Sequence, residues 1–234
     1  MSVRAGLAAW AWDWIKSIVI ALAIWLVLRT FFFQAFRIIS PSMVHTMEVG
    51  DWLFVNRALY GAEIPLLHRR LPVIREPRRG DIVVFDSKLE PITLVKRLIG
   101  VPGDTLAMHG GRLVRNGRPV DEPYVYHADI TRSADSAYRT QMRAAQLPHY
   151  VGASAGAYHP DIQEWGPLVV PADSLFFMGD NRDDSYDSRY WGVQARNRVQ
   201  GHASFVYYSY DPDSWRALPF LTAIRWSRIG MALR

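Results

Sequence analysis

The chain has 234 residues, half of them hydrophobic, and its 27 basic and 22 acidic residues give a formal net charge of +5. It contains no cysteine, which excludes a thiol nucleophile, cysteine metal ligands and disulfide bonds. A basic balance suits nucleic acid or anionic lipid. The sequence has no zinc-ligand spacing, aromatic RNA-binding signature or basic helix, so we predict no nucleic-acid partner and take the lipid bilayer as the simpler one.

The first predicted element is an apolar helix over residues 15–33. Lys16 and Arg29 are its only charged residues, one near each end. Such a helix spans about 28 Å, close to a hydrocarbon core of about 30 Å, and both cations can extend to the headgroups. We predict an uncleaved transmembrane anchor. Cleavage after Ala35 would put the bulky Phe33 at position −3, and a buried soluble helix would have to hide both charges.

Short strands separated by turns dominate the remainder of the chain. The predicted strand regions are 52–56, 80–86, 93–99, 168–180 and 202–211. Asn-Gly within residues 110–120 predicts a hairpin, residues 134–147 favour a helix, and residues 62–80 form a basic loop. Many short strands with few helices predict a mainly β fold built from antiparallel sheets.

A Ser-Pro-Ser-Met segment at residues 40–43 contains the candidate nucleophile, Ser42. A serine hydroxyl is inert at neutral pH unless a base takes its proton. If residues 38–42 run extended, Ser40 and Ser42 point to the same face. Ser40 Oγ then joins the backbone N–H of Ser42 as a donor to an oxyanion. The alternative is a plain turn between the anchor and a domain.

The candidate base is Lys96, one of only three lysines in the chain. In a strand, Lys96 shares a face with Leu94 and Leu98. Desolvation on that face favours the neutral amine, which can act as a general base. The alternative is a lysine at a strand edge that reaches water.

A polar loop at residues 179–192 contains four Asp, two Arg, two Ser and an Asn. So many polar groups in a short segment need one another, or a site, to satisfy their hydrogen bonds. A calcium loop is one reading, but the arginines repel a cation and the EF-hand spacing is missing. We predict no metal site.

The serine segment, the lysine strand and the polar loop follow an apolar helix in an order that resembles the bacterial type I signal peptidases. Residues 96–104, KRLIGVPGD, match a family motif that opens with the catalytic lysine. The resemblance implies a Ser–Lys serine endopeptidase without a cofactor. Such an enzyme cleaves N-terminal signal peptides from exported preproteins after small residues at −3 and −1. It also implies a single-pass protein of the bacterial cytoplasmic membrane, with a cytoplasmic N-terminus and a periplasmic catalytic domain.

The resemblance also assigns supporting roles. Ser185 is expected to hydrogen-bond the Lys96 amine, and Asp187 and Arg189 are expected to form an ion pair that supports the loop. Asp180, Asn181 and Arg182 are expected to be structural. The substrate pocket is expected to contain Ile38, Ile39, Met43, Met47, Leu94 and Val95.

The same comparison suggests four parts of the chain. They are an anchor segment (1–36), a first part of a catalytic β-core (37–104), an inserted cap (105–167) and a second part of the core with the tail (168–234). The sequence departs from the family motif at His45, where a proline is expected. A histidine near the serine allows a Ser–His mechanism, but an irregular segment three residues long rarely aligns such a pair, so we expect His45 to tune the mouth of the site.

Three other functions remain open. A Ser–Lys processing peptidase with a narrow substrate range would carry the same motifs. A cytosolic self-cleaving repressor disagrees with the anchor and with the missing DNA-binding domain. An anchored binding module with an inactive site disagrees with the full set of catalytic side chains. No required protein partner is evident from the sequence.

Overall fold

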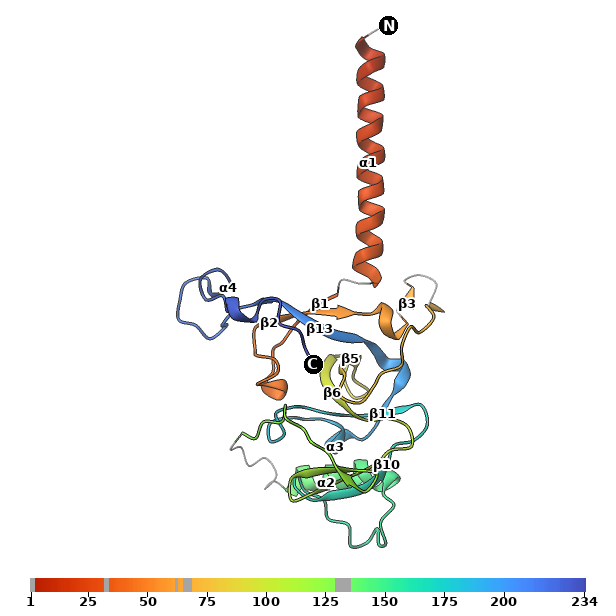
Figure 1. Ribbon diagram of the computed structural model, residues 1–234, viewed down its shortest axis with the longest axis vertical. Coiled ribbons are helices and arrows are strands. Elements are labelled where there is room, and N and C mark those ends of the chain that lie inside the picture. Colours follow the sequence, from red (N-terminus) through yellow and green to blue (C-terminus); the bar gives the residue numbers. More distant parts are fainter. Residues whose placement is uncertain (1–2, 32–33, 62, 65–68, 129–135) are drawn as a thin grey trace.

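Helix α1 (Val3–Phe31) stands apart from the β-rich remainder of the chain (Figure 1). The computed structural model describes residues 3–31, 34–61, 63–64, 69–128 and 136–234. The anchor predicted over residues 15–33 falls on α1, except for residues 32–33, which lie outside the described residues. Among the described residues, no helix has both the length and the apolar character needed to cross a bilayer. The transmembrane anchor therefore stays a prediction.

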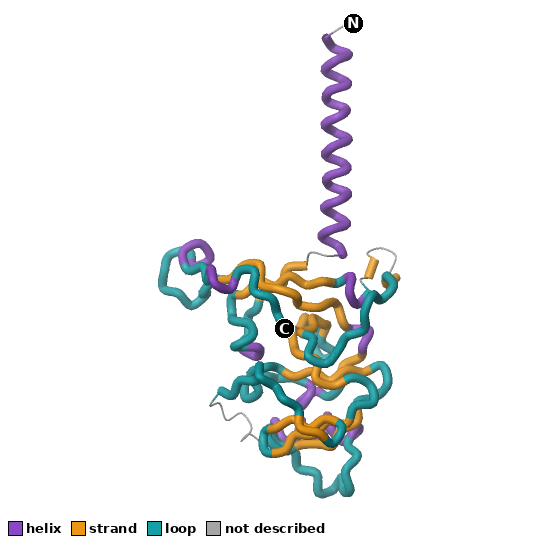
Figure 2. Tube along the Cα trace, in the orientation of Figure 1, coloured by secondary structure: helices purple, strands orange, loops and turns teal. Residues whose placement is uncertain are grey.

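Seven strands form the main sheet, in the order β1-β2-β13-β5-β6-β11-β12. Their bounds are β1 (Gln34–Arg37), β2 (Asp51–Asn56), β5 (Ile82–Asp86), β6 (Thr93–Gly100), β11 (Ser174–Met178), β12 (Gln194–Ala195) and β13 (Val199–Ser209). Every neighbouring pair is antiparallel, which confirms the predicted mainly β class. The pairing register of β13 shifts at several points. Such irregularities increase the local twist, and the sheet curls (Figure 2).

A second, four-stranded sheet lies at the end of the molecule opposite α1, in the order β10-β7-β8-β9 (Figure 1). Its elements and the nearby helix are β7 (Thr105–His109), β8 (Arg112–Arg115), β9 (Arg118–Pro119), β10 (Trp165–Val169) and α2 (Ser136–Gln146). Asn116 and Gly117 join β8 to β9 with φ values of 54° and 75°, as the predicted Asn-Gly hairpin requires. The helix predicted at 134–147 is confirmed as α2, with residues 134–135 outside the described part.

The region predicted as strand at 168–180 contains the end of β10 and the whole of β11. A turn separates them, in which Ser174 N donates to Pro171 O. Proline has no N–H for a strand ladder, which is a physical reason for the break. The remaining elements are β3 (Glu63–Ile64), β4 (Arg69–Arg70), α3 (Ser188–Trp191) and α4 (Pro219–Thr222). The four-part division of the chain stays a prediction.

Strand β5 is buried on both faces and divides two hydrophobic clusters. Ile82 and Val84 pack in one cluster, and Val83 and Phe85 pack in the other. This is the period-two pattern of a strand covered on both sides. Val83 is the direct partner of Lys96 on β6. The sheet therefore holds the lysine on a buried face next to apolar side chains.

Candidate active site

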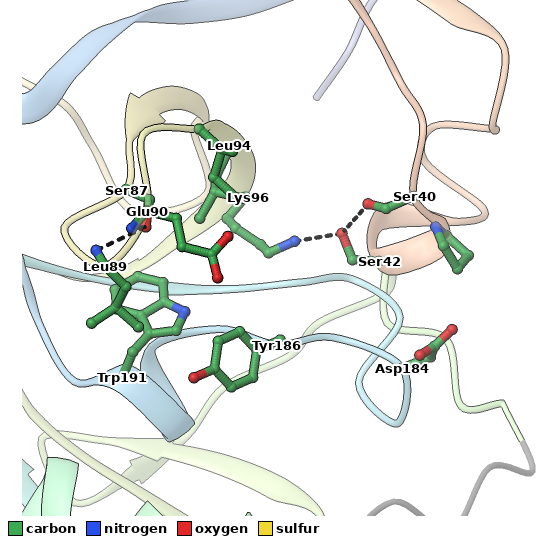
Figure 3. Close-up of a pocket in the computed structure, with 12 residues that line it drawn as sticks. Ser40, Ser42, Ser87, Leu89, Glu90, Leu94, Lys96, Asp184, Tyr186 and Trp191 are labelled. Atoms are coloured by element: carbon green, nitrogen blue, oxygen red, sulfur yellow. Dashed lines mark hydrogen bonds between the residues drawn. The ribbon is translucent and has the colours of Figure 1, made fainter. Parts of the chain in front are cut away.

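Ser42 and Lys96 are in contact although 54 positions separate them in the chain. Ser42 is the middle residue of a 3-10 turn, Pro41–Met43, and is 7% exposed. Lys96 extends from β6, and its Nζ is hydrogen-bonded to Ser42 Oγ (Figure 3). The fold thus brings together the two residues that the sequence predicted as nucleophile and base.

The environment of Lys96 favours its neutral amine. The side chain is 4% exposed, and burial is the main reason that the pKa of Lys96 falls from 10.5 to about 8. The carboxylate of Asp187 opposes this shift, whereas the guanidinium of Arg189 adds to it. A lysine with this pKa is neutral in about half of the molecules at pH 8, and the neutral amine can accept a proton.

Ser40 lies beside the candidate nucleophile. Its Oγ is 3.2 Å from Ser42 Oγ. The extended segment expected over 38–42 is only partly present, because Ser40 is extended but Pro41–Met43 forms a 3-10 turn. Proline at the first position of the turn suits its fixed φ. The two hydroxyls therefore become neighbours through a turn and not through alternation along a strand.

The polar loop contains the ion pair expected between Asp187 and Arg189. Arg189 donates to Asp187 through Nε at 2.9 Å and through Nη2 at 2.8 Å, and both side chains are fully buried. Burial opposes ionisation of Asp187, but the charge and hydrogen bonds of Arg189 outweigh it and lower the pKa of this carboxyl. Asp187 Oδ2 also accepts from the Gly179 N–H at 3.0 Å, so the pair holds the start of the loop to its end.

The structure does not form the hydrogen bond expected between Ser185 and the Lys96 amine. Ser185 Oγ is buried and helps to lower the pKa of the Asp187 carboxyl. The lysine amine points at Ser42 instead. A Cβ added to Gly179 would collide with Ser185 Oγ and with the Ser42 carbonyl. Sequence reasoning missed the role of Gly179. Only a residue without a Cβ atom lets the loop approach Ser42 so closely.

Three consecutive residues of the loop bind different parts of the site. Asp180 is paired with Arg97, with oxygen–nitrogen distances of 2.7 and 2.6 Å. The Asn181 N–H donates to the Ser42 carbonyl at 3.2 Å. Arg182 pairs with Glu122 at 2.6 Å. These contacts agree with the structural roles expected from the sequence. Within the described ranges, no cluster of three or more His, Asp or Glu residues is arranged to bind a metal ion.

A cleft of about 240 Å³ opens beside the Ser42–Lys96 pair (Figure 3). Leu94, Trp191, Tyr186 and Glu90 contribute to its walls. Of the six residues predicted for the substrate pocket, Leu94 lines this cleft. The other five do not line this cleft: Ile38, Met43, Met47 and Val95 pack with one hydrophobic cluster, and Ile39 is 79% exposed. Their part in substrate binding stays a prediction.

His45 is exposed and makes no hydrogen bond to Ser42. Its ring instead stacks on Tyr126, with a centroid distance of 4.1 Å and an interplanar angle of 21°. A histidine that acts as a base must reach the serine hydroxyl directly or through one water. The contact of Lys96 with Ser42 meets this requirement, which favours lysine as the base.

Comparison with known proteins shows to which family the chain belongs. The family profile described as "Signal peptidase, peptidase S26" matches residues 11–208. Signal peptidase I of Pseudomonas aeruginosa is 36% identical over 230 residues, which cover 92% of this chain and 77% of the relative. Signal peptidase I of Bacillus amyloliquefaciens is 32% identical over 200 residues, covering 85% and 86%. A crystal structure of a signal peptidase I from Enterococcus faecalis V583 is 27% identical, covers 56% of this chain and 98% of that chain, and gives a TM-score of 0.38.

A serine in a buried turn, hydrogen-bonded to a buried lysine on a curled antiparallel sheet, is a feature expected of a serine peptidase. The match over residues 11–208 and the identity to curated relatives show that the chain belongs to the signal peptidase family, peptidase S26. It is a serine endopeptidase of the signal peptidase I kind. The family predicted from the three sequence motifs and the predicted enzyme class are both confirmed.

Proposed function

We propose that this protein removes signal peptides from exported preproteins with Ser42 as nucleophile and Lys96 as general base. The observation that carries the proposal is the hydrogen bond between Ser42 Oγ and the buried Lys96 Nζ. Neutral Lys96 takes the hydroxyl proton while Oγ attacks the scissile carbonyl carbon. The resulting ammonium protonates the leaving amine, and Ser42 keeps the acyl group as an ester. A water then attacks the ester carbon and gives its proton to Lys96. Lys96 passes this proton to Ser42 Oγ as the bond between Oγ and the acyl carbon breaks, which releases the carboxyl product and restores Ser42.

The proposed oxyanion donors are Ser40 Oγ and the backbone N–H of Ser42. The 3.2 Å distance between the two serine oxygens supports this role for Ser40, because the oxyanion forms on the carbon bonded to Ser42 Oγ. The Ser42 N–H belongs to the first residues of a 3-10 turn, whose N–H groups have no partner within the turn. Removal of one such donor lowers kcat by about 10²–10³.

Cleavage after small residues at −3 and −1 is the proposed specificity. Leu94 supports it, because this apolar side chain borders the cleft next to Lys96. The proposed pocket residues also include Ile38, Ile39, Met43, Met47 and Val95. A substrate with alanine at both positions is expected to be cut, and phenylalanine at −1 is expected to stop cleavage.

The proposal includes attachment to the bacterial cytoplasmic membrane through α1, with the N-terminus in the cytoplasm and the catalytic domain in the periplasm. Support comes from the apolar side chains that α1 exposes between Trp10 and Leu26, which are all more than half exposed. Trp10, Trp12 and Trp14 precede the apolar run, as is typical of an interfacial belt. The proposed partners are preproteins and the lipid bilayer.

The central experiment is incubation of the detergent-solubilised full chain with a preprotein, in parallel with Ser42→Ala. The wild-type protein is expected to release the signal peptide at one site, and Ser42→Ala is expected to be inactive while it keeps its circular dichroism spectrum. Turnover by Ser42→Ala at the wild-type rate would refute the assignment of the nucleophile.

A set of unrelated preproteins separates general export processing from a narrow maturation function. The general enzyme is expected to cut most of the set, each after small residues at −3 and −1. Cleavage of a single substrate would favour the specialised peptidase.

A further inference from the structure

The turn that follows the nucleophile has an unusual backbone conformation at His45. The φ angle of His45 is 76°, in the left-handed region that side chains with a Cβ rarely adopt. Two hydrogen bonds close the turn, from the N–H groups of Thr46 and Met47 to the Met43 carbonyl at 3.2 and 2.8 Å. Proline, the residue expected here from the family motif, has φ fixed near about −65°. A proline therefore cannot adopt this turn. The strained backbone at His45 needs surrounding contacts that compensate its cost.

The side chain of His45 supplies such a contact. It stacks on Tyr126, which comes from the segment between β9 and α2. Offset aromatic stacking contributes free energy beyond the burial of area. A left-handed residue persists where its surroundings compensate the backbone strain. The stack involves the side chain of the strained residue, His45, so it can stabilise the left-handed conformation of that residue.

Tyr126 is in turn held by the loop that binds the nucleophile. Its N–H donates to the Asp180 carbonyl at 2.8 Å, and its carbonyl accepts from Arg182 N at 2.9 Å. Between those two residues, Asn181 donates its N–H to the Ser42 carbonyl at 3.2 Å. Ser42, Asn181, Tyr126 and His45 therefore form a closed circuit of contacts around the nucleophile turn.

We propose that His45 is a positioning residue, whose stack on Tyr126 sets the turn that presents Ser42 Oγ to Lys96. This role rests on the proposed function and adds to it the pair of His45 and Tyr126. His45 takes no proton in this role. The stack acts on the position of Ser42, so its loss is expected to lower kcat more than it changes KM.

The test compares variants that keep a ring with variants that lose it. Tyr126→Leu and His45→Asn remove one ring each, and asparagine still tolerates the left-handed backbone. Each is expected to lower kcat by about 2- to 13-fold, the equivalent of 0.5–1.5 kcal/mol for an aromatic pair. Tyr126→Phe keeps both rings and leaves the backbone of His45 unchanged, so it is expected to stay close to the wild-type kcat. The double variant His45→Asn/Tyr126→Leu is expected to lose no more than either single variant.

Tyr150→Leu is the matched control, because Tyr150 stacks on Tyr158 at 4.0 Å and 27° and forms a bridge to Leu168 in the second sheet. This control is expected to lower the Tm and to leave kcat unchanged. An unchanged kcat in Tyr126→Leu, or losses that multiply in the double variant, would overturn the proposal. So would an equal loss of kcat in Tyr150→Leu.

The pH profile separates positioning from proton transfer. All the stacking variants are expected to keep the wild-type inflection of kcat/KM, and loss of an inflection in His45→Asn would assign His45 to proton transfer and overturn positioning. Full activity of Ser42→Ala would instead refute the proposed function. If Tyr126→Leu leaves kcat unchanged and Ser42→Ala is inactive, the positioning role of the His45–Tyr126 stack is refuted and the proposed function is not.

Discussion

The two faces of strand β6 hold two buried cations in opposite electrostatic settings. Arg97 is 1% exposed and has a carboxylate partner, Asp180, with which it forms two short hydrogen bonds. Lys96, the preceding residue, is 4% exposed and has a serine hydroxyl as its partner. Arg97 also donates to the Gly80 carbonyl and lies over the Tyr124 ring at 3.8 Å.

The difference separates a cation that holds segments together from the proposed general base. A buried guanidinium with a bidentate carboxylate stays charged and holds segments together. A buried amine without a carboxylate contact is easily neutralised, because burial penalises the ammonium and little compensates it. Proximity in sequence therefore says little about role. The partner across the fold decides which of the two cations is available for proton transfer.

The largest effect is expected from changing Lys96 itself. Lys96→Met is expected to lower kcat by about 10³–10⁴-fold, at the upper end of a general-base contribution. Lys96→Arg is expected to be as inactive, because a guanidinium stays protonated. Single-turnover cleavage of a preprotein measures both. Lys88→Met is the matched control and should leave kcat largely unchanged. Substantial activity in Lys96→Arg would contradict the assignment of the base.

Changing Arg97, on the opposite face of β6, is expected to lower the stability of the fold. Arg97→Met leaves the buried Asp180 without its ion-pair partner, which is expected to cost about 3–5 kcal/mol of the free energy of unfolding. The double variant Arg97→Met/Asp180→Leu removes both charges and is expected to recover much of this loss. Urea denaturation measures both variants. A loss below about 1 kcal/mol in Arg97→Met would mean that the two cations do not differ as described.

The pKa of Lys96 predicts the pH dependence of activity. With a pKa of about 8, kcat/KM is expected to fall about tenfold per pH unit well below that value, since only the neutral amine accepts the serine proton. The rate should level off above it. Initial rates between pH 6 and pH 10 measure the profile, with Lys88→Met as the variant that keeps the inflection. A rate independent of pH across this range would exclude lysine as the base.

The same shift predicts a smaller effect on stability. The pKa of Lys96 is lower in the folded state, at about 8, than its ordinary value of 10.5. The unfolded chain therefore binds more protons between these values, and stability rises with pH across that window. Below pH 8 the folded protein bears the full free-energy cost of burying the charged Lys96. Lys96→Met is expected to raise the free energy of unfolding at pH 7 by about 1–3 kcal/mol.

Denaturation curves of the wild-type protein and Lys96→Met at pH 7 and pH 10 measure this penalty. The gain in stability is expected to shrink as the pH approaches 10.5. Arg97→Met offers the contrast, because arginine stays protonated throughout and its effect should not shrink in this window. A gain for Lys96→Met that is equal at both pH values would indicate better packing and no relief of a charge penalty.

Local patterns predicted much of the fold. The strands around residues 52–56, 80–86 and 93–99, the Asn-Gly hairpin and helix α2 all follow from short-range hydrophobic periodicity and turn chemistry. These local patterns did not predict how β7, β8, β9 and β10 assemble into a second sheet. The Ser40–Ser42 segment also differed from expectation, because a proline inside it favoured a 3-10 turn over an extended strand.

The sequence by itself determined which face of β6 carries Lys96, because side chains alternate along any strand and Leu94 and Leu98 mark that face as apolar. It also determined the family, through three motifs in a set order. Only the tertiary structure decided that Arg97 meets Asp180, 83 positions away. It also decided that Lys96 points at Ser42 and not at Ser185. These partners depend on how distant segments approach one another, and no local pattern of residues encodes that approach.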